Sequence, residues 1–210
     1  MKDYFLGRKH YEVALKLLPK TKEKLKLLEV GAQDGVLKPR LPQNISYSSL
    51  DMDGKSDYNF DLNKGKLPIK TGTFDILVCL ETLEHTFYPE KVIEELKRVT
   101  RKNGLFILSM PNEYNFWLRL NYLLARKMTH TDEPFQVISK LQHIHRPRVE
   151  DIINLFSKHF KIIKVIPMWQ SRRAEKKIFY FLDKIINYFA KIYPSLFSRV
   201  IIIVAKNKGV

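Results

Sequence analysis

The sequence has little cysteine, no long apolar run and a shortage of acidic residues. Its one cysteine, Cys79, has no partner, which excludes a disulfide within the chain and favours a reducing compartment. No stretch of about 18 uncharged apolar residues occurs, so a transmembrane helix is excluded. Residues 1–6 also lack the apolar stretch of a signal peptide. We therefore expect a cytoplasmic location, with peripheral membrane contact as an open alternative.

The shortage of acids leaves a strongly basic chain. There are 37 lysines and arginines against 22 aspartates and glutamates, a formal net charge of +15. This excess indicates either an acidic partner, such as an anionic surface, or simply a lysine-rich solvated exterior. The length of 210 residues suits one domain, and 45% hydrophobic residues are enough for a core.

Apolar runs and turn residues alternate along the chain. They predict strands at 25–30, 45–50, 74–80, 105–110, 160–167 and 199–205, with a very short strand inside 57–66. They predict helices at 4–18, 89–101, 115–128, 148–159 and 175–193, a short helix or turn at 36–41, and a polar loop at 129–134. This alternation indicates an α/β fold with a mostly parallel, doubly wound sheet and helices on both faces.

The most informative segment is residues 28–35, Leu-Glu-Val-Gly-Ala-Gln-Asp-Gly. A buried strand ends there and breaks into a turn, in which Gly31 and Gly35 let the backbone approach a ligand closely. Asp51 closes the next apolar run. A carboxylate at the end of the second strand of such a unit is placed to bind ribose hydroxyls.

These residues resemble the class I S-adenosylmethionine-dependent methyltransferases, in the branch that includes the ubiquinone-biosynthesis methyltransferases. Further segments match in order: Asp61-Leu62, Leu67-Pro68 with 74–80, Glu81-Thr82-Leu83-Glu84-His85, and 95–112. The resemblance covers residues 25–115 well. It implies a Rossmann-like sheet of seven strands whose C-terminal strand is antiparallel. It also suggests one methyltransferase domain over residues 1–210, with a helical insertion near 170–195.

The resemblance implies S-adenosylmethionine as the cofactor. Its expected contacts are Glu29, Gly31, Ala32, Gln33, Gly35, Asp51, Met52, Asp61, Leu62 and Leu80. Among them, Asp51 is expected to bind the ribose and Asp61 the adenine amino group. Gln33 replaces the family's middle glycine, and Asn103 replaces a glycine in the turn before 105–110. Asparagine tolerates left-handed backbone geometry, so the second change is mild.

A second cluster, Glu81, Glu84 and His85, follows the strand at 74–80, at the edge where ligands bind in such folds. His85, with Glu84 beside it, is the candidate general base, because an imidazole titrates near neutral pH. A divalent metal site completed by His143 or His145 is a second interpretation. It is similar to the arrangement in the small-RNA 3′-end methyltransferases and the metal-dependent quinone branch. A plain strand-to-helix turn is the third.

The resemblance favours methyl transfer to an unidentified acceptor, a small or lipid-like molecule. An RNA-modifying methyltransferase and a non-catalytic S-adenosylmethionine-binding protein remain alternatives. The helix at 175–193 has a wide apolar face, and Arg172, Arg173, Lys176 and Lys177 stand at its start. This pattern suits contact with an anionic membrane or a lid over the substrate mouth, but equally a helix packed on its own sheet or on a dimer partner. The sequence does not indicate an oligomeric state.

Overall fold

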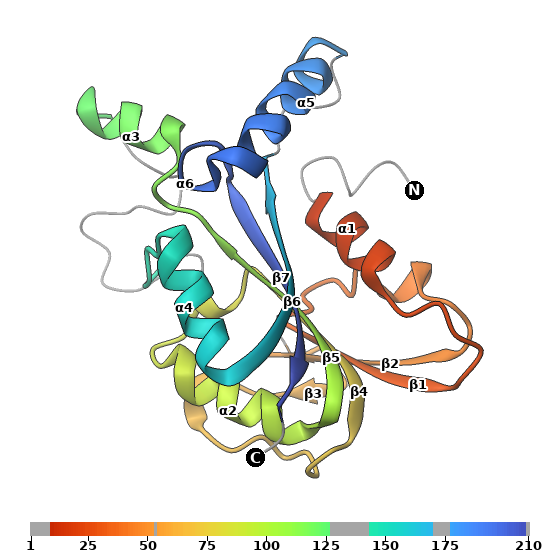
Figure 1. The fold of residues 1–210 in the computed structure, drawn as a ribbon. Coiled ribbons are helices and arrows are strands. Elements are labelled where there is room, and N and C mark those ends of the chain that lie inside the picture. The colour runs from red at the N-terminus through yellow and green to blue at the C-terminus, as the bar shows by residue number, and fades with distance from the viewer. Residues whose placement is uncertain (1–8, 53, 127–142, 170–176, 209–210) are drawn as a thin grey trace.

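One seven-stranded sheet organises the molecule, in the order β3-β2-β1-β4-β5-β7-β6 (Figure 1). The computed structural model describes residues 9–52, 54–126, 143–169 and 177–208. The strands are β1 (Leu25–Val30), β2 (Ile45–Asp51), β3 (Tyr58–Asn59), β4 (Phe74–Leu80), β5 (Thr100–Pro111), β6 (Phe160–Met168) and β7 (Val200–Asn207). The first five pair in parallel, and β7 runs antiparallel to both β5 and β6. The expected Rossmann-like, mostly parallel sheet is confirmed.

Helices cover both faces of the sheet (Figure 1). Helix α1 (Lys9–Leu17) buries Tyr11 and Ala14 in one core, and α2 (Pro89–Val99) and α4 (Val149–His159) bury Ile93 and Phe156 in the other. Central strands are apolar on both sides, as sequences of covered parallel strands are. The two cores fix the strand ends from which the candidate site is built.

The carboxyl ends of the parallel strands define one edge of the sheet, called the carboxyl edge below. Strands β1, β2, β4 and β5 end there. Strand β7 runs antiparallel to both β5 and β6. Val200 at its start therefore pairs with Pro111 at the end of β5 and with Met168 at the end of β6. The end of β6 and the start of β7 therefore lie at the same edge.

The predicted helix at 89–101 is too long. Helix α2 ends at Val99, because Thr100 already pairs with Phe74 in the sheet. The register then jumps from Phe74–Thr100 to Ile76–Leu105, so the intervening residues bulge. Asn103 has φ of 62° in this bulge, which is the left-handed geometry expected of it.

The other connections hold two further differences and three short 3₁₀ helices, the first of them within the short helix or turn predicted at 36–41. Helix α3 (Phe116–Leu123) is shorter than predicted, and Ala125 just beyond it has a positive φ of 50°. Helix α6 (Pro194–Phe197) was not predicted, and it follows α5 (Lys177–Ile192) between β6 and β7. Three-residue 3₁₀ helices stand at η1 (Lys38–Arg40), η2 (Leu62–Lys64) and η3 (Leu83–His85). The predictions for residues 4–8, 127–134 and 170–176, including those for Arg172, Arg173 and Lys176, lie outside the described residues.

Among the helices that the structure describes, none is long and apolar enough to cross a membrane. Helices α5 and α6 stand where the helical insertion was expected, while the assignment of residues 1–210 to a single domain stays a prediction.

Candidate functional site

The glycine turn packs closely against Thr82, just after the end of β4. Gly31 has φ of 71°, and a Cβ added there would lie 2.2 Å from Thr82 Oγ1. The Gly31 N–H donates to the Leu50 carbonyl at 2.9 Å, and Thr82 Oγ1 donates to the Leu80 carbonyl at 3.0 Å. Only glycine satisfies both the close approach and the left-handed backbone. Thr82 carries no local signal in the sequence that would predict this contact.

The glycine turn after β1 and the carboxylate at the end of β2 meet at Asp51. Its Oδ2 accepts from the Gln33 N–H at 2.9 Å, and its Oδ1 accepts from the Met52 N–H at 2.6 Å. An ionised carboxylate has about four lone-pair positions, so both oxygens retain capacity for ribose hydroxyls. Met52 is 51% exposed beside it. The residues at this end of β1 and β2 therefore fit the ribose of S-adenosylmethionine.

Gln33 adopts the geometry that a glycine would take at its position. Its φ is 44°, a region that non-glycine residues enter at a cost of about 1–2 kcal/mol. Gly35, two residues on, also has a positive φ of 62°, and Ala32 between β1 and Gln33 is fully buried. The turn therefore has a glycine-like backbone at position 33 although the residue there is glutamine.

Glu29 lies in β1 just before the turn and is buried. Tyr47 Oη donates to Glu29 Oε2 at 2.6 Å. Burial raises the pKa of Glu29 from its ordinary 4.5 to about 7, with the Tyr47 hydrogen bond acting in the opposite direction. Near neutral pH this carboxyl therefore exchanges a proton with solvent instead of standing permanently ionised.

On the expected adenine side, Asp61 caps a short helix. Its Oδ1 accepts from the Asn63 N–H at 2.9 Å at the start of η2, and Asn63 Oδ1 in turn accepts from the Phe87 N–H at 2.8 Å. Leu62 is half-buried, whereas Leu80 is buried in the core. Asp61 thus has a structural role as a cap, and its contact with adenine stays a prediction, as does that of Leu80.

The second cluster gathers around a buried carboxylate. Ligand atoms of Glu84, His85 and His143 all lie within 4.8 Å of one another. Glu84 is fully buried, and among the described residues neither of its carboxylate oxygens has a hydrogen-bond partner. Burial, then the nearby charge of Glu81, raises the pKa of Glu84 well above its ordinary range. Without a further partner, burial therefore favours the protonated form of this carboxyl.

The segment from His143 to His145 is fastened to the backbone around Glu84. The N–H groups of Ile144 and His145 donate to the Glu84 carbonyl at 2.9 and 3.2 Å. The His145 Nε2–H donates to the Thr86 carbonyl at 2.8 Å, which engages that ring nitrogen away from the cluster. The structure therefore brings His143, and not His145, to Glu84 and His85.

Glu113 and His10 complete this neighbourhood, and neither was expected from the sequence. His143 Nδ1 bonds the buried Glu113 carboxylate, which follows the end of β5 and orients the ring. Glu81, with φ of 48°, has its Oε2 3.9 Å from Nε2 of the buried His10 on α1. Glu81 therefore faces α1, while the cluster itself consists of Glu84, His85 and His143. Only the position of Glu113 after a strand end signals its role in the sequence.

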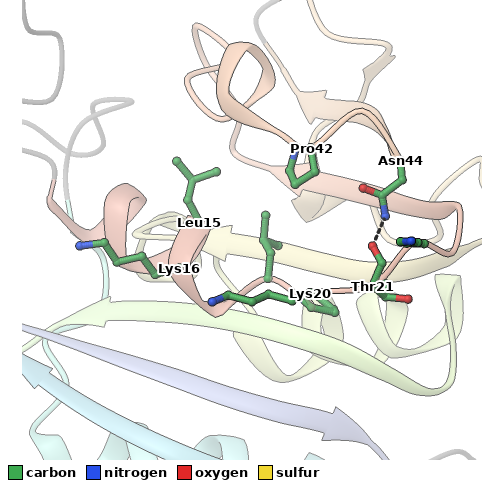
Figure 2. Close-up of a pocket in the computed structure, with 9 residues that line it drawn as sticks. Leu15, Lys16, Lys20, Thr21, Pro42 and Asn44 are labelled. Atoms are coloured by element: carbon green, nitrogen blue, oxygen red, sulfur yellow. Dashed lines mark hydrogen bonds between the residues drawn. The ribbon is translucent and has the colours of Figure 1, made fainter.

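A hollow of about 500 Å³ lies elsewhere (Figure 2). It is lined by Leu15, Lys16, Lys20, Thr21, Pro42 and Asn44 among others, and Asn44 Nδ2 donates to the Thr21 carbonyl at 2.9 Å. Thr21 and Asn44 precede β1 and β2, so the hollow lies at the amino ends of these strands. It is therefore separate from both clusters of the carboxyl edge.

Comparison with known proteins gives one family match. The profile of the family described as a methyltransferase domain matches residues 5–160, about three quarters of the chain. This span includes the glycine turn, Asp51, both carboxylates of the second cluster and both histidines of the segment docked on it. The search of curated proteins found no match.

Solved structures share the fold at low sequence identity. An S-adenosylmethionine-dependent methyltransferase from Mesorhizobium loti has a TM-score of 0.62 and 13% identity, covering 96% of this chain and 100% of that one. One from Archaeoglobus fulgidus has a TM-score of 0.59 and 12% identity, with 96% and 92% covered. A chain from the complex of the Haloferax volcanii Trm112 methyltransferase activator with a methyltransferase has a TM-score of 0.58 and 14% identity, with 95% and 89% covered. At these identities the likeness shows the fold alone.

Proposed function

The chain belongs to the methyltransferase domain family, its cofactor is S-adenosylmethionine, and on this premise we propose that it methylates a small, lipid-like acceptor. The proposal includes a place in the ubiquinone-biosynthesis-like branch, supported by the segment from Glu81 to His85. The observation that carries it is the buried Glu84 carboxyl beside His85 and His143.

The cofactor is assigned to the β1–β2 side of the carboxyl edge. Asp51 holds the ribose, the turn from Gly31 to Gly35 borders the methionine part, and Met52 covers the adenine. When bound, S-adenosylmethionine supplies a methyl group already activated on a sulfonium. The protein then has to orient the acceptor and exclude water, and orientation alone is worth on the order of 7–11 kcal/mol.

The acceptor is assigned to the side of Glu84 and His85. His85 removes the proton from the attacking atom of the acceptor, and Glu84 relays it: the carboxyl releases its own proton to solvent and takes the one held by the imidazolium, so that one proton leaves in all. The raised pKa of Glu84 supports this role, because burial favours the protonated carboxyl before the reaction. His143, held by Glu113, completes the polar wall around the acceptor's attacking atom.

A lipid-like acceptor is favoured by the side chains that surround the cluster. Phe87 and Tyr88 follow η3, and Tyr114 follows β5, and all three are exposed at the carboxyl edge. Exposed aromatic rings next to a polar cluster suit a ligand with an apolar body and one polar reacting group. An RNA acceptor is disfavoured by the acidic side chains Glu81, Glu84 and Glu113 around the cluster, although the exposed Arg146 follows His145 there.

A divalent cation held by Glu84, His85 and His143 is the second candidate. The unpartnered oxygens of Glu84 favour it, since a bound cation would satisfy a carboxylate that otherwise stays protonated. Two imidazoles and one carboxylate suit a transition metal better than Mg²⁺. In that case the carboxyl would be ionised, and His85 would be a ligand instead of a base.

The test measures transfer of a labelled methyl group to three acceptor pools: a lipid extract, water-soluble phenols and total RNA. We expect label in the lipid pool, at least a hundredfold loss in His85→Ala, and no loss in the control His159→Ala, which lies on α4. Label in RNA alone would overturn the acceptor class. Binding of the cofactor without transfer to any pool would favour a non-catalytic binding protein. Loss of transfer in excess EDTA, restored by added metal, would establish the cation in place of the base.

A further inference from the structure

Helix α5 faces the protein with its polar side and solvent with its apolar side. Asp183 is only 2% exposed and lies 3.6 Å from Lys9 Nζ. Asn187 exchanges two hydrogen bonds of 2.8 Å with the backbone of Trp169, at the end of β6, and Ala190 is fully buried. A helix that simply packs on its own sheet has the reverse arrangement. The core interpretation of this helix therefore does not account for its apolar side.

The outward side of α5 is large and aromatic. Phe181 is 62% exposed and Tyr188 63% exposed, although both are bulky. The other exposed large side chains include Leu182, Ile185, Phe189 and Ile192. Contiguous apolar patches of this kind are uncommon on monomeric soluble proteins and mark interaction surfaces.

Helix α3 presents a second surface of the same character. None of its residues is buried, and Leu123 is 79% exposed beside the exposed Trp117 and Tyr122. Its base is joined to α6, because Asn112 Nδ2 donates to the Ser198 carbonyl at 3.0 Å. Both α3 and α5 project from the same end of the molecule (Figure 1). We call the exposed side chains of α3 and α5 together the α3–α5 surface.

The charge of the α3–α5 surface is uniformly basic. Arg119, Arg126, Lys184 and Lys191 are exposed on or next to the two helices. The one acid within α3 or α5 is Asp183, which is buried. Tyrosine, tryptophan and basic residues around aliphatic ones form the composition that suits the boundary between lipid headgroups and acyl chains.

We propose that the α3–α5 surface docks on an anionic lipid membrane. The apolar side chains enter the boundary between headgroups and acyl chains, and the four basic residues meet the negative headgroups. The contact is peripheral, as neither helix is long and apolar enough to span a bilayer. The phosphates of a nucleic acid would complement the basic charge but would leave the aliphatic side chains of α5 without an apolar partner.

Docking at this end of the molecule would bring the membrane to the carboxyl edge, where β5 leads into α3 and where the candidate site lies. Delivery of a lipid-like acceptor from the membrane rests on the proposed function. The docking itself does not, because it involves neither the cofactor nor the cluster of Glu84, His85 and His143. The two proposals can therefore fail separately.

The experiment is flotation of the full chain, without cofactor, on phosphatidylglycerol-containing vesicles and on neutral phosphatidylcholine vesicles. We expect binding to the anionic vesicles. In Lys184→Glu/Lys191→Glu we expect at least a roughly twentyfold weaker partition coefficient, since each basic residue near the surface is worth about 1 kcal/mol. The matched control, Lys20→Glu/Lys22→Glu, lowers the net charge equally at the opposite edge of the sheet and should bind nearly as the parent does.

The apolar contribution is tested with Phe181→Ser/Tyr188→Ser. Both side chains are exposed, so the melting temperature should stay near that of the parent while vesicle binding falls at least tenfold. Ile163→Ser, exposed on β6, is the control and should bind normally. Equal loss in the two lysine pairs, or unchanged binding in the Phe181/Tyr188 variant, would overturn the proposal. So would a dimer by light scattering that Phe181→Ser/Tyr188→Ser dissolves, because a second copy would then cover the surface.

Discussion

Asp51 and Glu84 stand at the same edge of one sheet, yet their carboxylates differ in their hydrogen-bond partners. Both oxygens of Asp51 accept backbone N–H groups, from Gln33 and Met52. Neither oxygen of Glu84 has such a partner among the described residues, and its side chain is fully buried. The chain thus completes the β1–β2 side by its own backbone, while the Glu84 side needs a proton, a cation or an acceptor to complete it.

This difference indicates that the two sides of the site have separate roles. A carboxylate held by backbone N–H groups is positioned before any ligand arrives, which suits a cofactor that must bind in one orientation. The pKa of a buried carboxyl without partners depends strongly on its surroundings, which suits the acceptor side of the site, where a proton is transferred. Glu29, buried but bonded by Tyr47, is intermediate between the two.

The largest effect is expected from Glu84→Gln. If the carboxyl of Glu84 moves a proton, methyl transfer should fall about 10²–10⁴-fold, the usual range for an acid–base group. Because the parent carboxyl is protonated when unpartnered, the isosteric amide should leave the melting temperature of the cofactor-free chain nearly unchanged. Transfer rates and melting curves of Glu84→Gln and of the exposed control Glu90→Gln check both points. Normal transfer by Glu84→Gln would remove Glu84 from the reaction.

Gly31→Ala should destabilise the glycine turn on the cofactor side of the site. The new Cβ would meet Thr82 Oγ1 at 2.2 Å and would sit on a left-handed backbone. Overpacking and the strained φ together should cost about 2–5 kcal/mol of unfolding free energy.

Gly72→Ala is the matched control for this change, because Gly72 has a similar positive φ of 66° but the nearest atom to the added Cβ lies at 3.9 Å. Urea denaturation should show only the smaller backbone cost there, about 1–2 kcal/mol. Equal losses in the two variants would mean that the Thr82 contact does not constrain the turn.

Glu29→Gln should change how stability depends on pH. Since burial raises the pKa of Glu29 from 4.5 to about 7, the folded state holds this proton more tightly than the unfolded state. The contribution to stability is present below about pH 4.5 and is lost as pH rises through about 7, a loss of about 3 kcal/mol. Denaturation of parent and variant at about pH 5 and about pH 8 should show a smaller decrease in the variant. Identical decreases would contradict the raised pKa.

Asp61→Ala should give the smallest effect of the series. It removes the side-chain cap of η2, worth about 0.5–2 kcal/mol of stability. If Asp61 also accepts the adenine amino group, affinity for S-adenosylmethionine should fall by a further 0.5–1.5 kcal/mol or so, beyond any loss of folding. Calorimetry well below the melting temperature separates the two. Unchanged affinity would leave Asp61 as a cap only.

The sequence predicted the sheet well because its strands are continuous apolar runs. The bounds expected for β1 and β4 match the structure, and β2 extends one residue further. The end of α2 was misplaced because helix propensity continues through Arg101, whereas sheet pairing of Thr100 with Phe74 decides the boundary. Such tertiary contacts leave no local signal in the chain.

The site was predictable where one segment carries it. Residues 28–35 and Asp51 stand out locally, but Thr82 matters only because Gly31 lies against it. The choice of His143 over His145 depends on which ring the Thr86 carbonyl engages, and this too is set by folding of a distant segment. The outward orientation of the apolar side of α5 could not be foreseen, since the same pattern fits a core helix.

The most direct test is calorimetric titration of S-adenosylmethionine, without acceptor or added metal, into the parent, Asp51→Ala and Glu84→Gln. A preformed cofactor side predicts one bound cofactor in the parent. It predicts a loss of about 1.5–3 kcal/mol in Asp51→Ala, the range for a hydrogen bond to a charged group, and no change in Glu84→Gln. Equal affinity of Asp51→Ala and the parent, or an equal loss in both variants, would contradict the division between a cofactor side and an acceptor side.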